Sequence, residues 1–268
     1  MSIEIINRDF PRGEFRAAVF DFDGTLSLLR RNWQDVMIPM MVEILLETNS
    51  GESRDQLHAV VEEFVMRLNG RQTIYQMMQL AEEVRQRGGE PREPLAYKHQ
   101  YHERLWQQVG DRVASVRDGR VPPEQLTVPD AENLLKRLSQ AGLDLYLASG
   151  TDLVYVRDEL SVLQLDSYFG PHVYGALDDY KKFSKAMIIE QIIRDTHVPG
   201  SSIVGFGDGF VEIEEIKKVG GLAIGVASNE ETREGINAWK RNRLIQAGAD
   251  IIIGDYGCQD ELLGLMGF

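Results

Sequence analysis

Apolar residues first gather in the short segment 17–22, which is bounded by Gly13 and Gly24. A short apolar run between turn residues is typical of a buried strand. From about residue 32 to 119, apolar residues instead recur every three or four positions, which predicts helices and no strand. The first of these helices is expected over 33–47, where Pro39 predicts a kink or a late start.

Capping sequences mark further helices in the same stretch. Ser53 followed by Gln56 predicts a capping box at the start of one helix, and Thr73 followed by Gln76 predicts a second capping box. Another helix is expected over 95–109. The segment therefore forms a helical unit that interrupts whatever fold the first strand belongs to.

After a break at 121–123, strands and helices alternate along the chain. We expect strands over 143–148, 173–174, 202–206, 222–226 and 250–253. We expect helices over 130–141, 152–163, 184–195, 211–219 and 233–247. Strands separated by helices imply right-handed crossovers and a parallel sheet with helices on both faces. The predicted fold is α/β, with a core of residues 1–29 and 121–268 and an α-helical cap domain over 30–120.

Charge and cysteine content narrow the classes of function. The 268 residues include 29 Lys and Arg against 42 Asp and Glu, a net charge of −13, so we expect no binding to nucleic acid or anionic membrane. A single cysteine, Cys258, excludes an intrachain disulfide framework and a multi-cysteine metal site. No signal peptide and no apolar span of about 20 residues is present, which favours a cytoplasmic protein. Nothing in the sequence indicates an oligomeric state.

Two carboxylates follow the first predicted strand. In open parallel sheets, ligands bind at the carboxyl ends of the strands, and residues two apart in an extended chain point the same way. Asp21 and Asp23 therefore face one space, where they need a cation or a shared proton. Gly24 allows a sharp turn that brings backbone donors near. The competing interpretation is a solvated turn with two surface acids.

The hexapeptide Asp21-Phe22-Asp23-Gly24-Thr25-Leu26 resembles the first motif of the haloacid dehalogenase superfamily of phosphatases. With a helical insertion after this motif, the chain is most similar to phosphatases of the phosphoglycolate and phosphoserine type. The resemblance implies a Rossmann-like core in which Asp21 attacks phosphorus and becomes an aspartyl phosphate. Asp23 would protonate the departing oxygen and then activate the water that hydrolyses this intermediate.

The second and third family motifs have counterparts further along the chain. Ser149 and Gly150 follow the strand predicted over 143–148, where a hydroxyl and backbone N–H groups bind a phosphoryl oxygen, with Gly24 also expected beside the phosphate. Ser149 could instead be an ordinary capping or turn residue. The third motif is a lysine that neutralises the nucleophile and the phosphoryl group, and the candidates are Lys181, Lys182 and Lys185. We favour Lys185 over Lys182 because the segment 184–189 resembles the family variant in which a lysine opens a helix, and the alternative is that all three are ordinary surface lysines.

The fourth motif is acidic and follows the strand predicted over 202–206. Asp208 is expected to coordinate a metal, with Asp21 and the backbone carbonyl of Asp23 as further ligands by resemblance. Glu212 stands where many relatives have aspartate, so its longer side chain would hold the metal directly or through a water. An all-oxygen ligand set of this kind is what Mg²⁺ favours.

The sequence therefore predicts a Mg²⁺-dependent phosphatase that acts on a small phosphorylated metabolite through an aspartyl phosphate. A phosphomutase on the same scaffold, a phosphonatase using Lys98 as its cap amine and a catalytically silent binding protein are the alternatives. Arg30 and Arg31 lie at the entrance to the cap. We expect both to lie in a solvated hinge, and a contact with an anionic substrate group is the alternative role.

Overall fold

The computed structural model describes residues 3–268, which group into two compact units. One unit contains the chain up to Arg31 together with Val113–Phe268, and the other is Asn32–Arg112. The cap domain predicted over 30–120 extends further at its C-terminal side than the second unit does. The last helix of that stretch runs on to Arg117, and its residues from Val113 onward group with the first unit.

Within residues 3–268, seven strands form one sheet in the order β1-β7-β6-β5-β2-β3-β4. The strands are β1 (Glu4–Ile5), β2 (Ala17–Phe20), β3 (Asp144–Asp152), β4 (Val173–Ala176), β5 (Ile203–Gly207), β6 (Leu222–Val226) and β7 (Ile251–Ile253). Neighbouring strands are parallel except for β1, which pairs antiparallel with β7. The central strands are continuous apolar runs because both of their faces are buried. The predicted parallel sheet is thus confirmed, and β1 is an addition that the sequence pattern did not predict.

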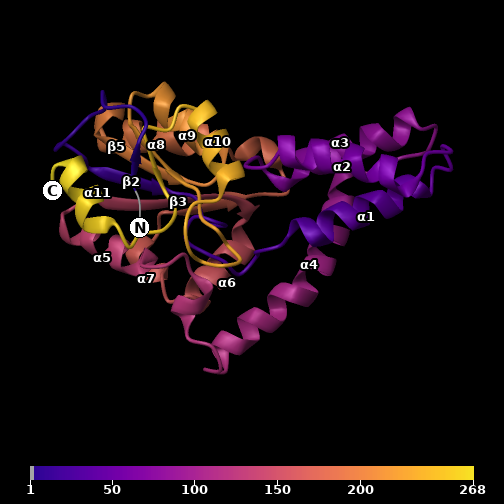
Figure 1. The fold of residues 1–268 in the computed structure, drawn as a ribbon, viewed down its shortest axis with the longest axis horizontal. Coiled ribbons are helices and arrows are strands. Elements are labelled where there is room, and N and C mark those ends of the chain that lie inside the picture. Colours follow the sequence, from indigo (N-terminus) through magenta and orange to yellow (C-terminus); the bar gives the residue numbers. More distant parts are fainter. Residues whose placement is uncertain (1–2) are drawn as a thin grey trace. The chain divides into compact units, whose positions relative to one another are not determined.

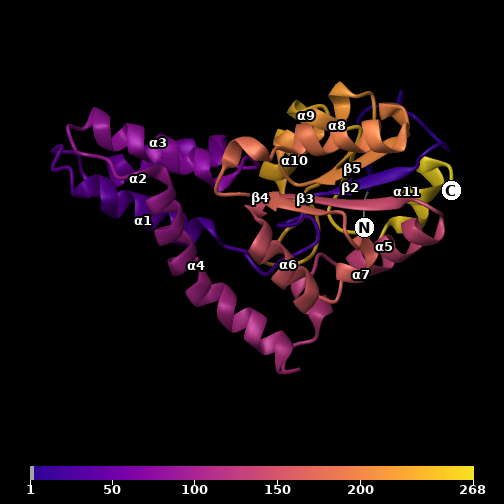
Figure 2. The ribbon, with the colours of Figure 1, turned by 180° about the vertical axis from the view of Figure 1, so that it is seen from behind.

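Helices cover both faces of this sheet (Figures 1 and 2). On one face lie α8 (Lys185–Thr196), α9 (Phe210–Lys218) and α10 (Ala238–Gln246). On the other lie α5 (Ala131–Gln140), α6 (Leu153–Val162) and α7 (Asp166–Phe169). The remaining helices of this unit are α11 (Gln259–Met266) and the short 3₁₀ turns η1 (Pro123–Leu126), η2 (Tyr180–Lys182) and η3 (Gly200–Ser202). The layered α/β fold is the expected one.

The second unit is helical. It contains α1 (Gln34–Leu46), α2 (Arg54–Arg67), α3 (Thr73–Gln86) and most of α4 (Pro94–Arg117). The capping box of Ser53 and Gln56 is present at the start of α2. The capping box predicted for Thr73 and Gln76 is wrong, because Thr73 is already helical and the Gln76 amide donates to the carbonyl of Val65 instead. Among the described residues, no helix is both long and apolar enough to cross a membrane.

The strand register aligns the end of β2 with β5, which ends one residue further on, and with β3, which continues five residues further. Phe20, the last residue of β2, lies opposite Leu147 of β3 and Phe206 of β5. The rings of Phe20 and Phe206 stack with their centroids 4.5 Å apart, which fixes the two strands relative to each other. The residues that follow Phe20, Leu147 and Phe206 along the chain therefore lie close together at one edge of the sheet.

Candidate active site

Three carboxylates meet at this edge of the sheet. Asp21 directly follows β2, Asp208 follows β5, and Glu212 lies in the first turn of α9. Each of the three offers one oxygen, and these oxygens all lie within 4.8 Å of one another. Asp21 and Glu212 are buried. We call these three residues the acid cluster.

The turn after β2 leaves room for the acid cluster only because Gly24 has no side chain. Gly24 has a φ of +74°, a conformation that other residues rarely adopt. A Cβ atom on Gly24 would lie 2.2 Å from Asp208 Oδ2, which is an overlap. The glycine is therefore needed both for the turn and for the close approach of Asp208.

A buried lysine joins two members of the acid cluster. Lys185 Nζ lies 3.0 Å from Asp21 Oδ1 and 2.8 Å from Glu212 Oε1. Its place at the start of α8 is set by Ser184, whose hydroxyl caps the helix. Lys182, the alternative, has a side chain that is 73% exposed and pairs with Asp179. Lys181 is exposed as well, so of the lysines weighed from the sequence Lys185 is the one at the cluster.

Asp23 lies beside the cluster in a polar setting of its own. The Thr151 hydroxyl donates to Asp23 Oδ2 at 2.7 Å, and Arg30 Nε lies 3.9 Å from Asp23 Oδ1. Arg30 in turn donates through Nε and Nη2 to Glu159, a fully buried carboxylate on α6. The expectation of a solvated hinge is thus wrong for Arg30, because this ion pair takes its guanidinium into the core unit; Arg31 is partly buried.

The predicted phosphate-binding residues follow the same edge. Ser149 is buried in the C-terminal part of β3, and its hydroxyl accepts a hydrogen bond from the Thr151 backbone N–H at 3.1 Å. Gly150 lies between them. β3 continues four residues beyond the predicted end at 148, so Thr151 comes level with Asp23. Its contact with Asp23 was not predicted because the strand was expected to end earlier.

Three further residues at the site were not predicted from the sequence. Lys240 Nζ, from α10, lies 2.7 Å from Asp208 Oδ2 and 2.6 Å from Glu230 Oε1. It also donates to the Ser228 hydroxyl at 3.2 Å. Ser228 and Glu230 follow β6, whose end lies beside that of β5. The order of the strands could therefore have indicated that the loop after β6 lies near Asp208. Lys240 gave no signal, because it lies in the middle of the helix predicted over 233–247.

Burial changes the protonation of these groups. It raises the pKa of Asp21 to about 7 against the opposing effect of Lys185, and that of Asp208 to about 6 against Lys240. Burial likewise raises the pKa of Asp23 to about 7, although Arg30 lowers it. Burial alone would lower the pKa of Lys185, but Asp21 and Glu212 raise it above its ordinary value. The site therefore combines a permanently charged ammonium with an acid that can carry a proton near neutral pH.

The donor set of the acid cluster suits a hard divalent cation. All of its donors are carboxylate oxygens, which Mg²⁺ prefers over nitrogen and sulfur. Glu212 Oε2 is buried and has no hydrogen-bond partner among the described residues. The ammonium groups of Lys185 and Lys240 already contact these carboxylates, so the fit to a metal rests on the donor type and on this unpaired oxygen. These residues fit a Mg²⁺ ion.

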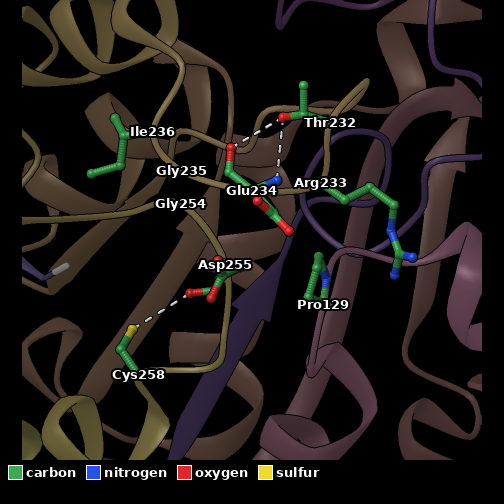
Figure 3. Close-up of a pocket in the computed structure, with 9 residues that line it drawn as sticks. All are labelled: Pro129, Thr232, Arg233, Glu234, Gly235, Ile236, Gly254, Asp255 and Cys258. Carbon is green, nitrogen blue, oxygen red and sulfur yellow. Dashed lines mark hydrogen bonds between the residues drawn. The ribbon is translucent and has the colours of Figure 1, made fainter. Parts of the chain in front are cut away.

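A separate cavity of about 650 Å³ opens next to the end of β7 (Figure 3). It is lined by Pro129, Thr232, Arg233, Glu234, Gly235, Ile236, Gly254, Asp255 and Cys258. No member of the acid cluster contributes to its lining. The loop after β6 thus contributes both to the site and to this cavity. Ser228 and Glu230 contact Lys240, and later residues of the loop line the cavity.

A family model described as haloacid dehalogenase-like hydrolase matches residues 15–220. The chain belongs to the haloacid dehalogenase-like hydrolases. The match includes the acid cluster, Asp23, Ser149 and Lys185, and it ends before Ser228, Glu230 and Lys240. No curated protein sequence matches the chain.

Solved structures of this family share the fold across nearly the whole chain. A protein described as a predicted phosphoglycolate phosphatase from Haemophilus somnus 129pt is 16% identical with a TM-score of 0.60, covering 93% of this chain and 98% of its own. A predicted phosphatase from Clostridium acetobutylicum is 18% identical with a TM-score of 0.58, covering 94% and 98%. A putative beta-phosphoglucomutase from Thermotoga maritima is 20% identical with a TM-score of 0.52, covering 94% and 98%. At these identities the likeness concerns the fold.

Proposed function

We propose that this hydrolase is a Mg²⁺-dependent phosphatase that hydrolyses a small phosphorylated metabolite through an aspartyl phosphate, an acyl phosphate formed on Asp21. The observation that carries the proposal is the pairing of Asp21 with Lys185 at 3.0 Å. Two residues after Asp21 stands a second acid, Asp23, which accepts a hydrogen bond from Thr151. A nucleophilic carboxylate beside a fixed cation, with a proton donor next to it, is what phosphoryl transfer requires. The cytoplasmic location stays a prediction from the sequence.

The first step transfers the phosphoryl group to the protein. A carboxylate oxygen of Asp21 forms a bond to phosphorus while the bond from phosphorus to the ester oxygen breaks. Asp23 gives its proton to the departing oxygen, which leaves as an alcohol. The raised pKa of Asp23, about 7, keeps a fraction of this acid protonated at neutral pH.

The second step returns the protein to its starting state. Asp23, now ionised, takes a proton from a water molecule whose oxygen attacks phosphorus. The bond between phosphorus and Asp21 breaks, and inorganic phosphate leaves. Using one residue first as acid and then as base lets a single site perform both halves of the reaction.

Fixed positive charge and hydrogen-bond donors offset the charge on the phosphoryl group. Lys185 lies against the nucleophile, and the Ser149 hydroxyl with the backbone N–H of Gly150 would hold phosphoryl oxygens. Asp21, Asp208 and Glu212, with the backbone carbonyl of Asp23 by family resemblance, would hold Mg²⁺. Mg²⁺ would supply charge neutralisation for the nucleophile and the transferring group.

A phosphomutase is the second candidate, because a putative beta-phosphoglucomutase shares the fold and the same steps would serve it. In a mutase the aspartyl phosphate passes to a second hydroxyl of the substrate instead of to water. The two candidates are separated by the products, because only the phosphatase releases inorganic phosphate in step with substrate loss.

The test is a phosphate-release screen with a panel of phosphorylated metabolites and p-nitrophenyl phosphate, with MgCl₂ and with EDTA. We expect Mg²⁺-dependent release from the parent and at least a 10³-fold loss in Asp21→Asn, since a covalent nucleophile is removed. Asp144→Asn is the matched control, because Asp144 is exposed at the opposite end of β3. Equal activity of parent and Asp21→Asn would refute the proposal.

A further inference from the structure

A second buried lysine contacts the acid cluster, and the proposed reaction gives it no role. The ammonium of Lys240 lies 2.7 Å from Asp208 Oδ2 and 2.6 Å from Glu230 Oε1, and its side chain is 9% exposed. Lys185 already neutralises Asp21 and Glu212. The two lysines therefore divide the carboxylates between them, and Asp208 belongs to Lys240.

The surrounding contacts fix the ammonium of Lys240 at the turn after β2. It donates to the Ser228 hydroxyl, which itself donates to the carbonyl of Gly24 at 2.6 Å. A Cβ on Gly24 would lie 2.9 Å from Lys240 Nζ. Asn237 caps the start of α10 and so sets the direction of the lysine. The ammonium and the glycine turn thus share one narrow space with Asp208.

We propose that Lys240 is an internal cation that competes with Mg²⁺ for Asp208, with Glu230 as the alternative partner of its ammonium. This inference rests on the proposed function, in which Asp208 is a Mg²⁺ ligand. The exchange of Asp208 between the ammonium and the divalent ion sets how much Mg²⁺ the site needs. Lys240 is in this sense a positioning residue, because it acts on Asp208 and not on the substrate.

The charges at the site explain why Lys240 weakens the binding of Mg²⁺ to Asp208 and does not assist it. Two cations on one carboxylate repel each other, and burial strengthens that repulsion because water screens it less. Glu230 offers the ammonium a second carboxylate at 2.6 Å, so Lys240 keeps an ion pair when Asp208 turns to the metal. A compact ammonium on a flexible stem suits such an exchange.

The test measures Mg²⁺ binding by titration calorimetry, and the Mg²⁺-induced rise in melting temperature, on the full-length protein without substrate. We expect Lys240→Met to bind Mg²⁺ at least about tenfold more tightly than the parent, because the competing charge is gone. We expect Glu230→Gln to bind Mg²⁺ more weakly, because Asp208 is then the only carboxylate left to the ammonium. Lys240→Arg keeps the positive charge, so its Mg²⁺ affinity should lie closer to that of the parent than to that of Lys240→Met.

Arg243→Met is the matched control for charge at a distance. The Arg243 guanidinium interacts electrostatically with Glu212 and Asp208, and it lies over the rings of Phe210 and Trp239, 4.7 Å and 5.3 Å from their centroids. Removing it should tighten Mg²⁺ binding by less than about threefold. An effect as large as that of Lys240→Met would show that general charge, and not the contact with Asp208, governs affinity, and would overturn the inference.

Two further outcomes separate this inference from the proposed function. If the parent hydrolyses phosphoesters with Mg²⁺ but Lys240→Met binds the ion no more tightly, the inference fails and the proposed function stands. If the parent binds no Mg²⁺, both fail. Should Lys240→Met not fold, Glu230→Gln decides: weaker Mg²⁺ binding supports the competition, and unchanged binding overturns it.

Discussion

The ion pair between Arg30 and Glu159 gives the sharpest prediction about stability. Arg30 donates to Glu159 through two nitrogens, and the two side chains are 8% and 0% exposed. Removing Glu159 takes from the buried guanidinium the carboxylate to which it donates and leaves Asp23 at 3.9 Å; breaking a buried pair in this way costs about 3–5 kcal/mol. We therefore expect Glu159→Leu to lower the melting temperature by roughly 6–20 °C, since each kcal/mol corresponds to about 2–4 °C for a unit of this size.

The double variant separates pairing from packing. Replacing both partners with apolar residues of similar volume is often neutral, so Arg30→Met with Glu159→Leu should recover most of the loss. Arg30 also lies 5.4 Å from the centroid of the Tyr155 ring and near Asp23, so full recovery is not expected. The coupling energy of the double-mutant cycle should be about 3 kcal/mol, measured by urea unfolding.

The matched control is Asp158, the residue before Glu159 on α6. Asp158 pairs with Arg117, and both side chains are about half exposed, so solvent screens the pair. Asp158→Leu should cost less than about 1 kcal/mol. The reasoning is refuted if Glu159→Leu costs no more than Asp158→Leu, or if the cycle shows no coupling between Arg30 and Glu159.

Three further predictions concern the reaction. With saturating Mg²⁺, kcat/KM should fall as the pH rises through the pKa of Asp23, which burial raises to about 7 in the protein without metal and which a bound Mg²⁺ would lower. Arg30→Met should move this limb to higher pH because the guanidinium lowers that pKa, and a limb that stays in place contradicts the assignment. Gly24→Ala should reduce Mg²⁺ binding and activity at least tenfold, checked by calorimetry and phosphate release, because the added methyl overlaps Asp208; parental behaviour would count against the close approach. EDTA should abolish turnover and Mg²⁺ restore it, and full activity in EDTA would exclude a metal role for the acid cluster.

Much of the core could be read from the sequence because buried parallel strands are continuous apolar runs. The strand predicted over 222–226 has those bounds in the structure. Asp21 and Asp208 were singled out because each stands near the end of a predicted strand, in a segment that resembles a family motif. β1 escaped prediction because two residues are too few to show a pattern. The capping box at Thr73 failed because the Gln76 side chain is buried against the preceding helix, where Val65 offers it a carbonyl.

The polar partners at the site were harder to predict, because their contacts depend on tertiary packing. Thr151 meets Asp23 only because β3 continues past Ala148. Glu159 lies on α6, where a glutamate is ordinarily solvent-facing, and its burial depends on Arg30 from a distant part of the chain. Lys240 belongs to a helix with other basic residues, and its burial depends on Asp208 and Glu230 from other parts of the chain, which no helical pattern predicts.

The short antiparallel strand at the start of the chain has a consequence for the behaviour of the protein in solution. β1 covers the outer side of β7, a run of three isoleucines whose unpaired N–H and C=O groups would otherwise invite another chain to add to the sheet. Arg241 anchors it by pairing with Glu4 at 2.6 Å, and Asn7 donates to Asp250 at 2.9 Å. Removing residues 3–7 would therefore expose the edge of β7 and promote self-association of the protein.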